Sequence, residues 1–437
     1  MSGANYLPSF LRIKIPTKLP LTNLVTLPGF EQGLYYHEYM HYLQDLTTTF
    51  GIIKIWQSYD RARQVIVDVL SRTGNVKIPL TGAAVDEQLD YWRFLIRQEG
   101  SFRVRPDWKI SSLRDIANRY TIKSVLLTPD PLIQQIIPST NTCHVDLVLS
   151  LANMPDETYR FGQNAVAEAM AYLAESKLYS LQKPEHYPYL VAKDLANFIY
   201  PHIGQSDELL FALCDTALMH PLPGWAFHSV LTAMNAKGFS GKTGEEVIDF
   251  GYEFFAINGW SIQWQCRKAE YSTQHILNQL FNHPYFANSL LWLQTIISRG
   301  QALRWANPYF FIELFRQQKR FSPEFFKVWD DLGGPLCIND DGIAFMKEPV
   351  NFQHLSDSIH PQHFLVTKQI NDLLLKEVIP CSLESICKKM TSPLPVDVRC
   401  GHEPWLRAKD NDKCPFGAAW ALYGFDKIPF EINGMTF

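Results

Sequence analysis

GLYYHEYMHYLQDLTTTFG, residues 33 to 51, carries the pattern from which the fold of this 437-residue chain is first inferred. Apolar residues recur along it at helical spacing: Leu34, Met40, Leu43, Leu46 and Phe50. This pattern predicts a helix that begins near Gly33. His37 and His41 are four residues apart and therefore lie one turn apart on the same helix face. Both imidazoles can reach a single metal ion from that face.

The residue after the first histidine suits the chemistry of a hydrolytic zinc site. Glu38 would lie beside the metal, where a carboxylate can take a proton from zinc-bound water and return it to a leaving amine. Zinc lowers the pKa of such a water to about 7. The motif therefore favours Zn²⁺ as the cofactor, with His37 and His41 as ligands and Glu38 as the general base. Asp45, four residues after His41, is expected to hold a liganding histidine by its other ring nitrogen.

A catalytic zinc also needs a third protein ligand and an open position. The best candidate is Glu168, in the run FGQNAVAEAMAYLAESKLYSLQ, residues 161 to 182. Strong helix formers dominate this run and predict a second helix. Its small side chains, such as Ala165, Ala169 and Ala171, would let it pack closely against the motif helix. We therefore expect two helices that face each other across the ion.

Asp60 is an alternative third ligand, because it lies 19 residues after His41. An unbroken helix would place Asp60 about 28 Å from His41, at about 1.5 Å per residue. Asp60 could therefore ligate only if the chain turned back near Gly51. The sequence leaves this alternative open.

Two segments resemble a known superfamily of zinc peptidases. HEYMHYLQD, residues 37 to 45, resembles the H-E-x-x-H-x-x-x-D motif of thermolysin-like enzymes, and NAVAEAMAYLAE, residues 164 to 175, is similar to the helix that carries the third glutamate in gluzincin peptidases. The resemblance implies His37, His41 and Glu168 as ligands and Glu38 as general base. Glu168 follows His41 by 127 residues, a far longer gap than in the compact families. Tyr172 stands where thermolysin-like enzymes carry an aspartate, and we expect it beside the ligands.

The composition indicates a globular protein and limits its partners. Hydrophobic residues make up 46% of the chain, aromatic residues 13% and charged residues 19%, which leaves little room for disorder. A net charge of −4 without a basic run argues against nucleic acid as a partner. The absence of a long apolar window argues against a membrane span. The N-terminus lacks a secretory signal pattern, and eight thinly spread cysteines suit reduced thiols, so we expect a cytoplasmic protein.

The expected fold class is mainly α (α+β), with a small N-terminal sheet from residues 10 to 16 and 23 to 27. We expect a zincin-like catalytic region over residues 1–200, with a long insertion between the motif and the third ligand. A helical region over 201–330 and a cysteine-containing lobe over 331–437 would follow. Four cysteines lie in that lobe: Cys381, Cys387, Cys400 and Cys414. Their spacing contains no C-x-x-C pair, so scattered thiols and a second, structural metal site both stay open.

The sequence thus predicts a zinc metallopeptidase of the gluzincin type that hydrolyses peptide bonds of an intracellular protein or peptide. The long gap before Glu168 leaves room for a lid, and a regulatory partner protein is a further expectation. The alternative is a non-catalytic helical interaction protein in which HEYMH is structural or degenerate. Metal content discriminates between the two.

Overall fold

The computed structural model describes residues 4–81, 100–102, 120–137, 142–151, 156–179, 187–376, 380–389, 396–410, 414–432 and 435–436. Within these residues the chain is mainly helical with small sheets, which confirms the expected fold class. The α-helices are α1 (Gly29–Thr47), α2 (Thr49–Ser71), α5 (Pro131–Ile136), α6 (Gln163–Leu178), α7 (Val191–Ile199), α8 (Pro201–Gly204), α9 (Asp207–Leu218), α10 (Pro223–Lys237), α11 (Gly244–Ile257), α12 (Ile262–Phe281), α13 (Ala287–Ala306), α14 (Phe310–Arg316), α15 (Pro323–Leu332), α16 (Gln362–Lys376), α17 (Glu384–Lys389), α18 (Arg399–His402) and α19 (Pro415–Leu422).

Short 3₁₀ helices and strands connect these helices. The 3₁₀ helices are η1 (Leu24–Thr26), η2 (Pro284–Phe286), η3 (Val350–Ser358), η4 (Pro404–Lys409) and η5 (Phe425–Lys427). The strands are β1 (Asn5–Leu7), β2 (Arg12–Lys14), β3 (Val76–Ile78), β4 (Ser101–Phe102), β5 (Tyr120–Pro129), β6 (Cys143–Leu151), β7 (Glu157–Phe161), β8 (Leu336–Ile338), β9 (Ala344–Phe345), β10 (Phe430–Ile432) and β11 (Met435–Thr436). No helix in this described part of the chain is both long and apolar enough to cross a membrane.

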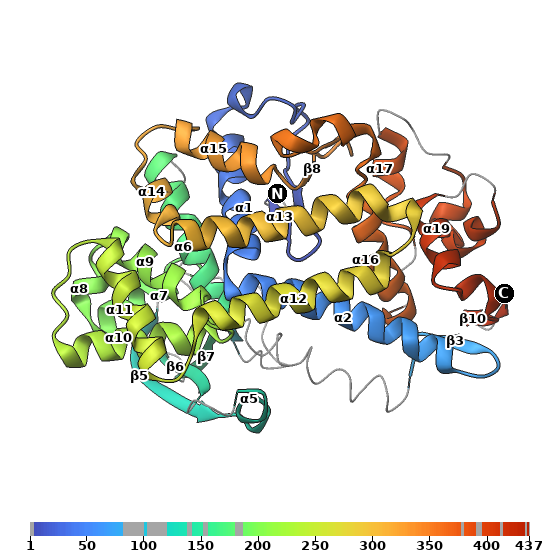
Figure 1. Ribbon diagram of the computed structural model, residues 1–437. Coiled ribbons are helices and arrows are strands. Elements are labelled where there is room, and N and C mark those ends of the chain that lie inside the picture. Colours follow the sequence, from blue (N-terminus) through green and yellow to red (C-terminus); the bar gives the residue numbers. More distant parts are fainter. Residues whose placement is uncertain are drawn as a thin grey trace.

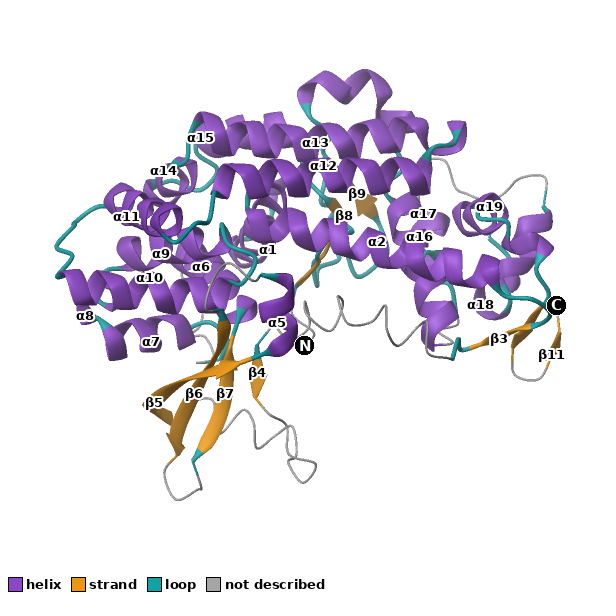
Figure 2. Ribbon diagram, turned by 60° about the horizontal axis from the view of Figure 1, so that its bottom comes forward, coloured by secondary structure: helices purple, strands orange, loops and turns teal. Residues whose placement is uncertain are grey.

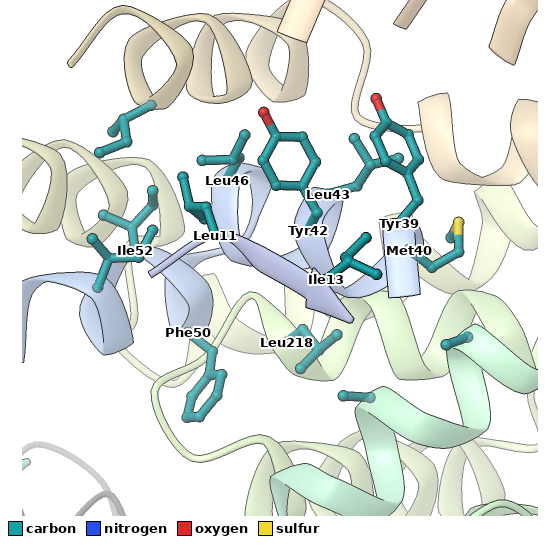
Figure 3. Close-up of a cluster of buried hydrophobic side chains, with 14 of the residues drawn as sticks. Leu11, Ile13, Tyr39, Met40, Tyr42, Leu43, Leu46, Phe50, Ile52 and Leu218 are labelled. Atoms are coloured by element: carbon teal, nitrogen blue, oxygen red, sulfur yellow. The ribbon is translucent and has the colours of Figure 1, made fainter. Parts of the chain in front are cut away.

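Helix α1, which carries the HEYMH motif, lies in the centre of the molecule (Figure 1) and is buried along almost its whole length. One of its faces is aromatic and packs into the core, where Figure 3 shows Tyr39 and Tyr42 with other buried side chains. The Tyr39 hydroxyl donates a hydrogen bond to the carbonyl of Gly333 at 3.0 Å, and the Tyr42 hydroxyl donates to that of Leu332 at 2.8 Å. The tyrosines around the motif therefore fix α1 against the end of α15, while the histidines lie on another face.

The chain bends sharply between α1 and α2 at Thr48, three residues before Gly51. Thr48 ends α1, because its N–H donates to the carbonyl of Gln44, and it begins α2 by accepting a hydrogen bond from the N–H of Gly51. A Cβ atom at position 51 would lie 2.3 Å from the carbonyl oxygen of Gln44. Position 51 therefore requires glycine, because the first turn of α2 touches the last turns of α1.

A four-stranded sheet brings Glu168 back to the motif helix. Strands β4, β7, β6 and β5 lie side by side in that order and project from the helical body (Figure 2). Strand β7 ends at Phe161, and only Gly162 separates it from α6. Helix α6 then packs directly on α1. The long gap between the motif and Glu168, the expected third ligand, is therefore occupied in part by α2 and this sheet. The sheet was not predicted from the sequence.

Two other sheets join distant parts of the chain. The strand expected within residues 10 to 16 forms as β2, which pairs antiparallel with β1 and parallel with β8, and β8 pairs with β9. Strand β3 pairs parallel with β10. Residues of the first and last predicted regions thus share two sheets, and the division into three regions stays a prediction. The prediction of a strand at 23 to 27 is wrong. The side chain of Asn23 accepts a hydrogen bond from the N–H of Val25, and the 3₁₀ helix η1 forms there.

Candidate metal centre

Three side chains that the sequence singled out meet between α1 and α6. The Nε2 atoms of His37 and His41 are 3.2 Å apart, and the Oε2 atom of Glu168 lies 3.0 Å from the first and 3.5 Å from the second. Two ligands at about 2.0–2.1 Å from a tetrahedral ion are themselves about 3.3 Å apart. These three residues, called the metal centre below, therefore form a group that is close enough to hold a metal ion.

The far nitrogen of His37 is held by a carboxylate on the neighbouring helix. Its Nδ1 atom lies 3.0 Å from Oε2 of Glu175, two turns after Glu168 on α6. An ionised carboxylate only accepts hydrogen bonds, so Nδ1 carries the proton. In the neutral imidazole, Nε2 then presents a lone pair toward Glu168 and His41.

The far nitrogen of His41 is fixed in the same way by an amide. Its Nδ1 atom lies 2.9 Å from Oε1 of Gln44. The Nε2 atom of Gln44 donates to the carbonyl of Ala167 at 3.2 Å, so its Oε1 atom is the side that faces the histidine. Nδ1 of His41 is therefore the donor, and its Nε2 atom also presents a lone pair.

Three lone pairs thus converge on one point. When both imidazoles are neutral and Glu168 is ionised, no hydrogen atom lies between them. Such an arrangement needs a cation, either a proton or a metal ion. Without a metal the protons take this place. Burial alone lowers the pKa of His37, but hydrogen bonds to Glu168 and Glu175 outweigh it and raise that pKa well above its usual value. Burial alone raises the pKa of Glu168, but the charges of His41 and His37 and their hydrogen bonds hold it well below its usual range.

The metal centre opens into a polar cleft of about 200 Å³. Glu38 borders this cleft beside the two histidines and is 7% exposed. Burial raises the pKa of Glu38, whereas the two histidines lower it, with a net increase. Within the described residues no side chain or backbone N–H donates a hydrogen bond to this carboxylate, so it is available to a molecule in the cleft.

Two residues expected to orient the ligands do something else. Asp45 borders the cleft, but it accepts hydrogen bonds from the Tyr6 hydroxyl and the Ser9 N–H, both at 2.9 Å. It thereby ties the N-terminal segment to α1, and Glu175 and Gln44 hold the histidines in its place. The Tyr172 ring packs on Tyr189 at 5.9 Å between centroids. Tyr189, and not Tyr172, lies against His37, with its ring edge-on to the imidazole.

The alternative ligand Asp60 takes no part in the centre. It lies on α2, and its carboxylate accepts hydrogen bonds from Arg63 at 2.8 Å and from Gln64 at 2.7 Å. The chain does bend near Gly51, but α2 then runs away as an unbroken helix and carries Asp60 with it.

Several residues of the site were missed from the sequence. Glu175 follows Glu168 by seven residues, which places it on the same helix face, and Gln44 follows His41 by three. Helical spacing could have found both. Tyr6, whose ring stacks on His41 at 6.4 Å, and Tyr189 come from distant segments and carry no local signal.

Comparisons of the chain with protein-family models, with curated proteins and with solved structures find no match. The function is therefore argued from the geometry of the centre.

Proposed function

We propose that this chain is a zinc-dependent peptidase of the gluzincin type whose ion is held by His37, His41 and Glu168. The observation that carries the proposal is the convergence of three ligand lone pairs beside an available carboxylate, that of Glu38. Two imidazoles and one glutamate are a donor set that catalytic zinc sites use, with one position left open. Carboxylate and amide partners on both Nδ1 atoms are also typical of liganding histidines.

The residues around the centre have separate tasks in this proposal. Zn²⁺ bound there would supply Lewis acidity toward a peptide carbonyl and would lower the pKa of a water molecule. Glu38 accepts a proton from water and returns it to the amine that leaves. Glu175 and Gln44 keep both imidazoles in the tautomer whose Nε2 atom is free to ligate.

The cleft also bears on the substrate. About 200 Å³ is less than the roughly 300–1,000 Å³ of ordinary small-molecule pockets. A folded protein does not fit such a space, so we propose that the cleaved segment is an extended, flexible stretch of a protein or peptide. All eight cysteines are free and buried, which supports a reducing compartment such as the cytoplasm. A regulatory partner stays a prediction.

Replacing Glu38 tests the catalytic part of the proposal. We expect Glu38→Gln to lose about 10²–10⁴-fold in the rate of cleavage of a fluorescence-quenched peptide library, because the amide cannot accept the proton. Its zinc content, measured by elemental analysis, should equal that of the wild type. Glu31→Gln, on the first turn of the same helix, is the matched control and should keep both activity and zinc.

Two outcomes would contradict this function. Full activity in Glu38→Gln would remove that residue from the mechanism. A zinc-loaded wild type that cleaves no library member but binds a protein partner in a pull-down experiment would favour the non-catalytic interaction protein instead.

A further inference from the structure

The cleft beside the metal centre continues along α1 toward the C-terminal end of that helix. Asp45 borders it there, one helical turn after the second histidine. Helix α6 runs antiparallel to α1, because Glu175 contacts His37, whereas Ala167, eight residues earlier, contacts Gln44. The first turn of α6 therefore lies beside the last turns of α1, at the end of the cleft away from the ion.

An amide oxygen without a donor lies at this end. Gln163 and Asn164 begin α6 and border the cleft. Gln163 is 8% exposed, and its Oε1 atom is buried without a hydrogen-bond partner. Of the described side chains with such an unpartnered buried atom, only Gln163 borders this cleft. A buried acceptor without a donor costs free energy, and a peptide main chain in the cleft would offer the missing N–H.

A lysine lies at the same end. A Cβ atom at position 51 would lie 2.3 Å from the carbonyl oxygen of Gln44 and 2.4 Å from the Cα atom of Asp45. Lys54 follows Gly51 by three residues, so it lies on the same face of α2, and it borders the cleft. Within the described part of the chain it is the only Lys or Arg residue that does so.

The ammonium group of Lys54 has no direct counter-ion. No carboxylate oxygen of the described residues lies within 4.0 Å of its Nζ atom, which lies 5.8 Å from the ring of Phe50. Asp45 is the acidic group at this end, and its Oδ2 atom already accepts hydrogen bonds from the Tyr6 hydroxyl and the Ser9 N–H. The first turn of α6 contains no acidic residue and has no side-chain cap, so its helix dipole adds positive potential. This end of the cleft therefore suits an anion.

We propose that Lys54, Gln163 and the first turn of α6 form a subsite for a carboxylate of the peptide substrate, called the carboxylate subsite below. Lys54 pairs with the carboxylate, and Oε1 of Gln163 accepts a main-chain N–H of the same stretch of peptide. The inference rests on the proposed peptidase function and names the substrate class: peptides that carry a carboxylate near the cleaved bond.

The distance along α1 indicates how near. Asp45 lies about 6 Å beyond His41, at about 1.5 Å per residue of helix. An extended peptide advances about 3.3 Å per residue, so the carboxylate belongs about two residues from the cleaved bond. Either a free C-terminus or the side chain of Asp or Glu can supply it. The first would make the reaction a release of short C-terminal peptides, whereas the second would allow cleavage within a chain.

Matched peptide pairs test the carboxylate subsite. One pair differs by a free C-terminal carboxylate against a C-terminal amide, and the others by Glu against Gln at each position around the cleaved bond. We expect the wild type to cleave the acid of at least one pair with about tenfold higher kcat/KM, and that pair identifies the source of the carboxylate. Lys54→Met removes the charge and should bring this ratio to about one. Lys18→Met, at an exposed lysine outside the cleft, is the matched control and should keep the ratio.

Gln163→Leu tests the second contact. Because Oε1 has no partner in the free protein, the free energy of unfolding by urea should not decrease, whereas kcat/KM for the preferred peptide should fall about tenfold. Gln32→Leu is the matched control and should lose stability instead, because the Gln32 amide donates to the carbonyls of Leu24 and Val25. An unchanged kcat/KM in Gln163→Leu would overturn the role of Gln163 and would mean that water satisfies its oxygen.

Binding separates this inference from the peptidase proposal. Fluorescence anisotropy of labelled peptides on zinc-loaded Glu38→Gln measures Kd without cleavage. Tighter binding of the acid than of its neutral partner, lost on adding Lys54→Met, would support the subsite even if the wild type cleaved no peptide. A preference for the acid that persists in Lys54→Met would place the carboxylate on the zinc ion, and equal Kd values for both peptides would mean that Lys54 only balances Asp45. Either result would overturn the inference.

Discussion

Helix α1 touches two buried polar clusters that differ in one respect. In its middle lies the metal centre of His37, His41 and Glu168, and at its C-terminal end lies the ion pair of Arg304 on α13 with Asp215 on α9. Both clusters contain ionisable groups away from water. Burial alone therefore does not distinguish a functional cluster from a structural one.

The match between donors and acceptors does distinguish them. Arg304 is fully buried and donates to both carboxylate oxygens of Asp215, at 2.9 and 2.7 Å, and to the carbonyls of Thr47 and Pro308, both at 3.0 Å. Two phenylalanine rings lie against its guanidinium at 4.9 and 5.1 Å. Each guanidinium nitrogen there donates to an acceptor, whereas the three ligand atoms of the metal centre have no donor between them until a proton or a metal ion binds. We infer that the first cluster holds the fold and the second holds a ligand.

Breaking the ion pair of Arg304 with Asp215 should have the largest effect on stability. Arg304→Met leaves the carboxylate of Asp215 buried and unpaired, so we expect a loss of about 3–5 kcal/mol in the free energy of unfolding by urea. The double variant Arg304→Met/Asp215→Leu removes both charges and should recover most of this loss. A loss below about 1 kcal/mol in the single variant would remove the contrast.

Changing Glu168 in the metal centre should leave the stability of the metal-free protein unchanged and should remove the stabilisation by zinc. Glu168→Gln replaces a lone pair by an amide whose N–H can donate to Nε2 of His37 or His41, so the metal-free protein should keep its stability. Zinc at 100 times the dissociation constant of this site stabilises the wild type by about 2.7 kcal/mol through that site. The variant should lack this increment when its free energy of unfolding by urea is compared in the presence and in the absence of zinc. An unchanged increment would exclude Glu168 as a ligand.

The smallest effect is expected at Glu175, which contacts His37 and not the ion. Glu175→Gln weakens the hold on Nδ1 of His37 and should reduce zinc affinity about 10–100-fold in competition with a chromophoric chelator. Asp45→Asn is the matched control and should leave zinc affinity unchanged, because Asp45 bonds Tyr6 and Ser9 instead. Equal losses in both variants would mean that Asp45 orients the histidines after all.

The sequence predicted the two helices of the centre because both signals are local. The period of apolar residues in α1 and the helix-forming composition of α6 act over neighbouring turns, and the His37–His41 spacing follows from one helical turn. The bounds were less accurate: α1 begins at Gly29 and not near Gly33, after the N-cap at Pro28.

What the sequence could not provide is contact over long separations. One of the two partners of β2 is β8, more than 300 residues away, and nothing local in either strand selects the other. The four-stranded sheet before α6 was missed, although alternation in YTIKSVLLTP, residues 120 to 129, could have indicated β5. Asp45 was predicted to hold a histidine because its helical spacing fits. Its carboxylate instead accepts hydrogen bonds from the N-terminal segment, and spacing along one helix cannot predict a contact with another segment.

The metal centre can be tested most directly by an anomalous difference map at the zinc absorption edge, from crystals of the wild type grown with zinc. We expect a peak bounded by Nε2 of His37, Nε2 of His41 and Oε2 of Glu168, at about 2.0–2.2 Å from each. A map without a peak there, with the two Nε2 atoms still within hydrogen-bond distance of each other and of Glu168, would contradict this expectation. The cluster would then be one more structural contact of α1.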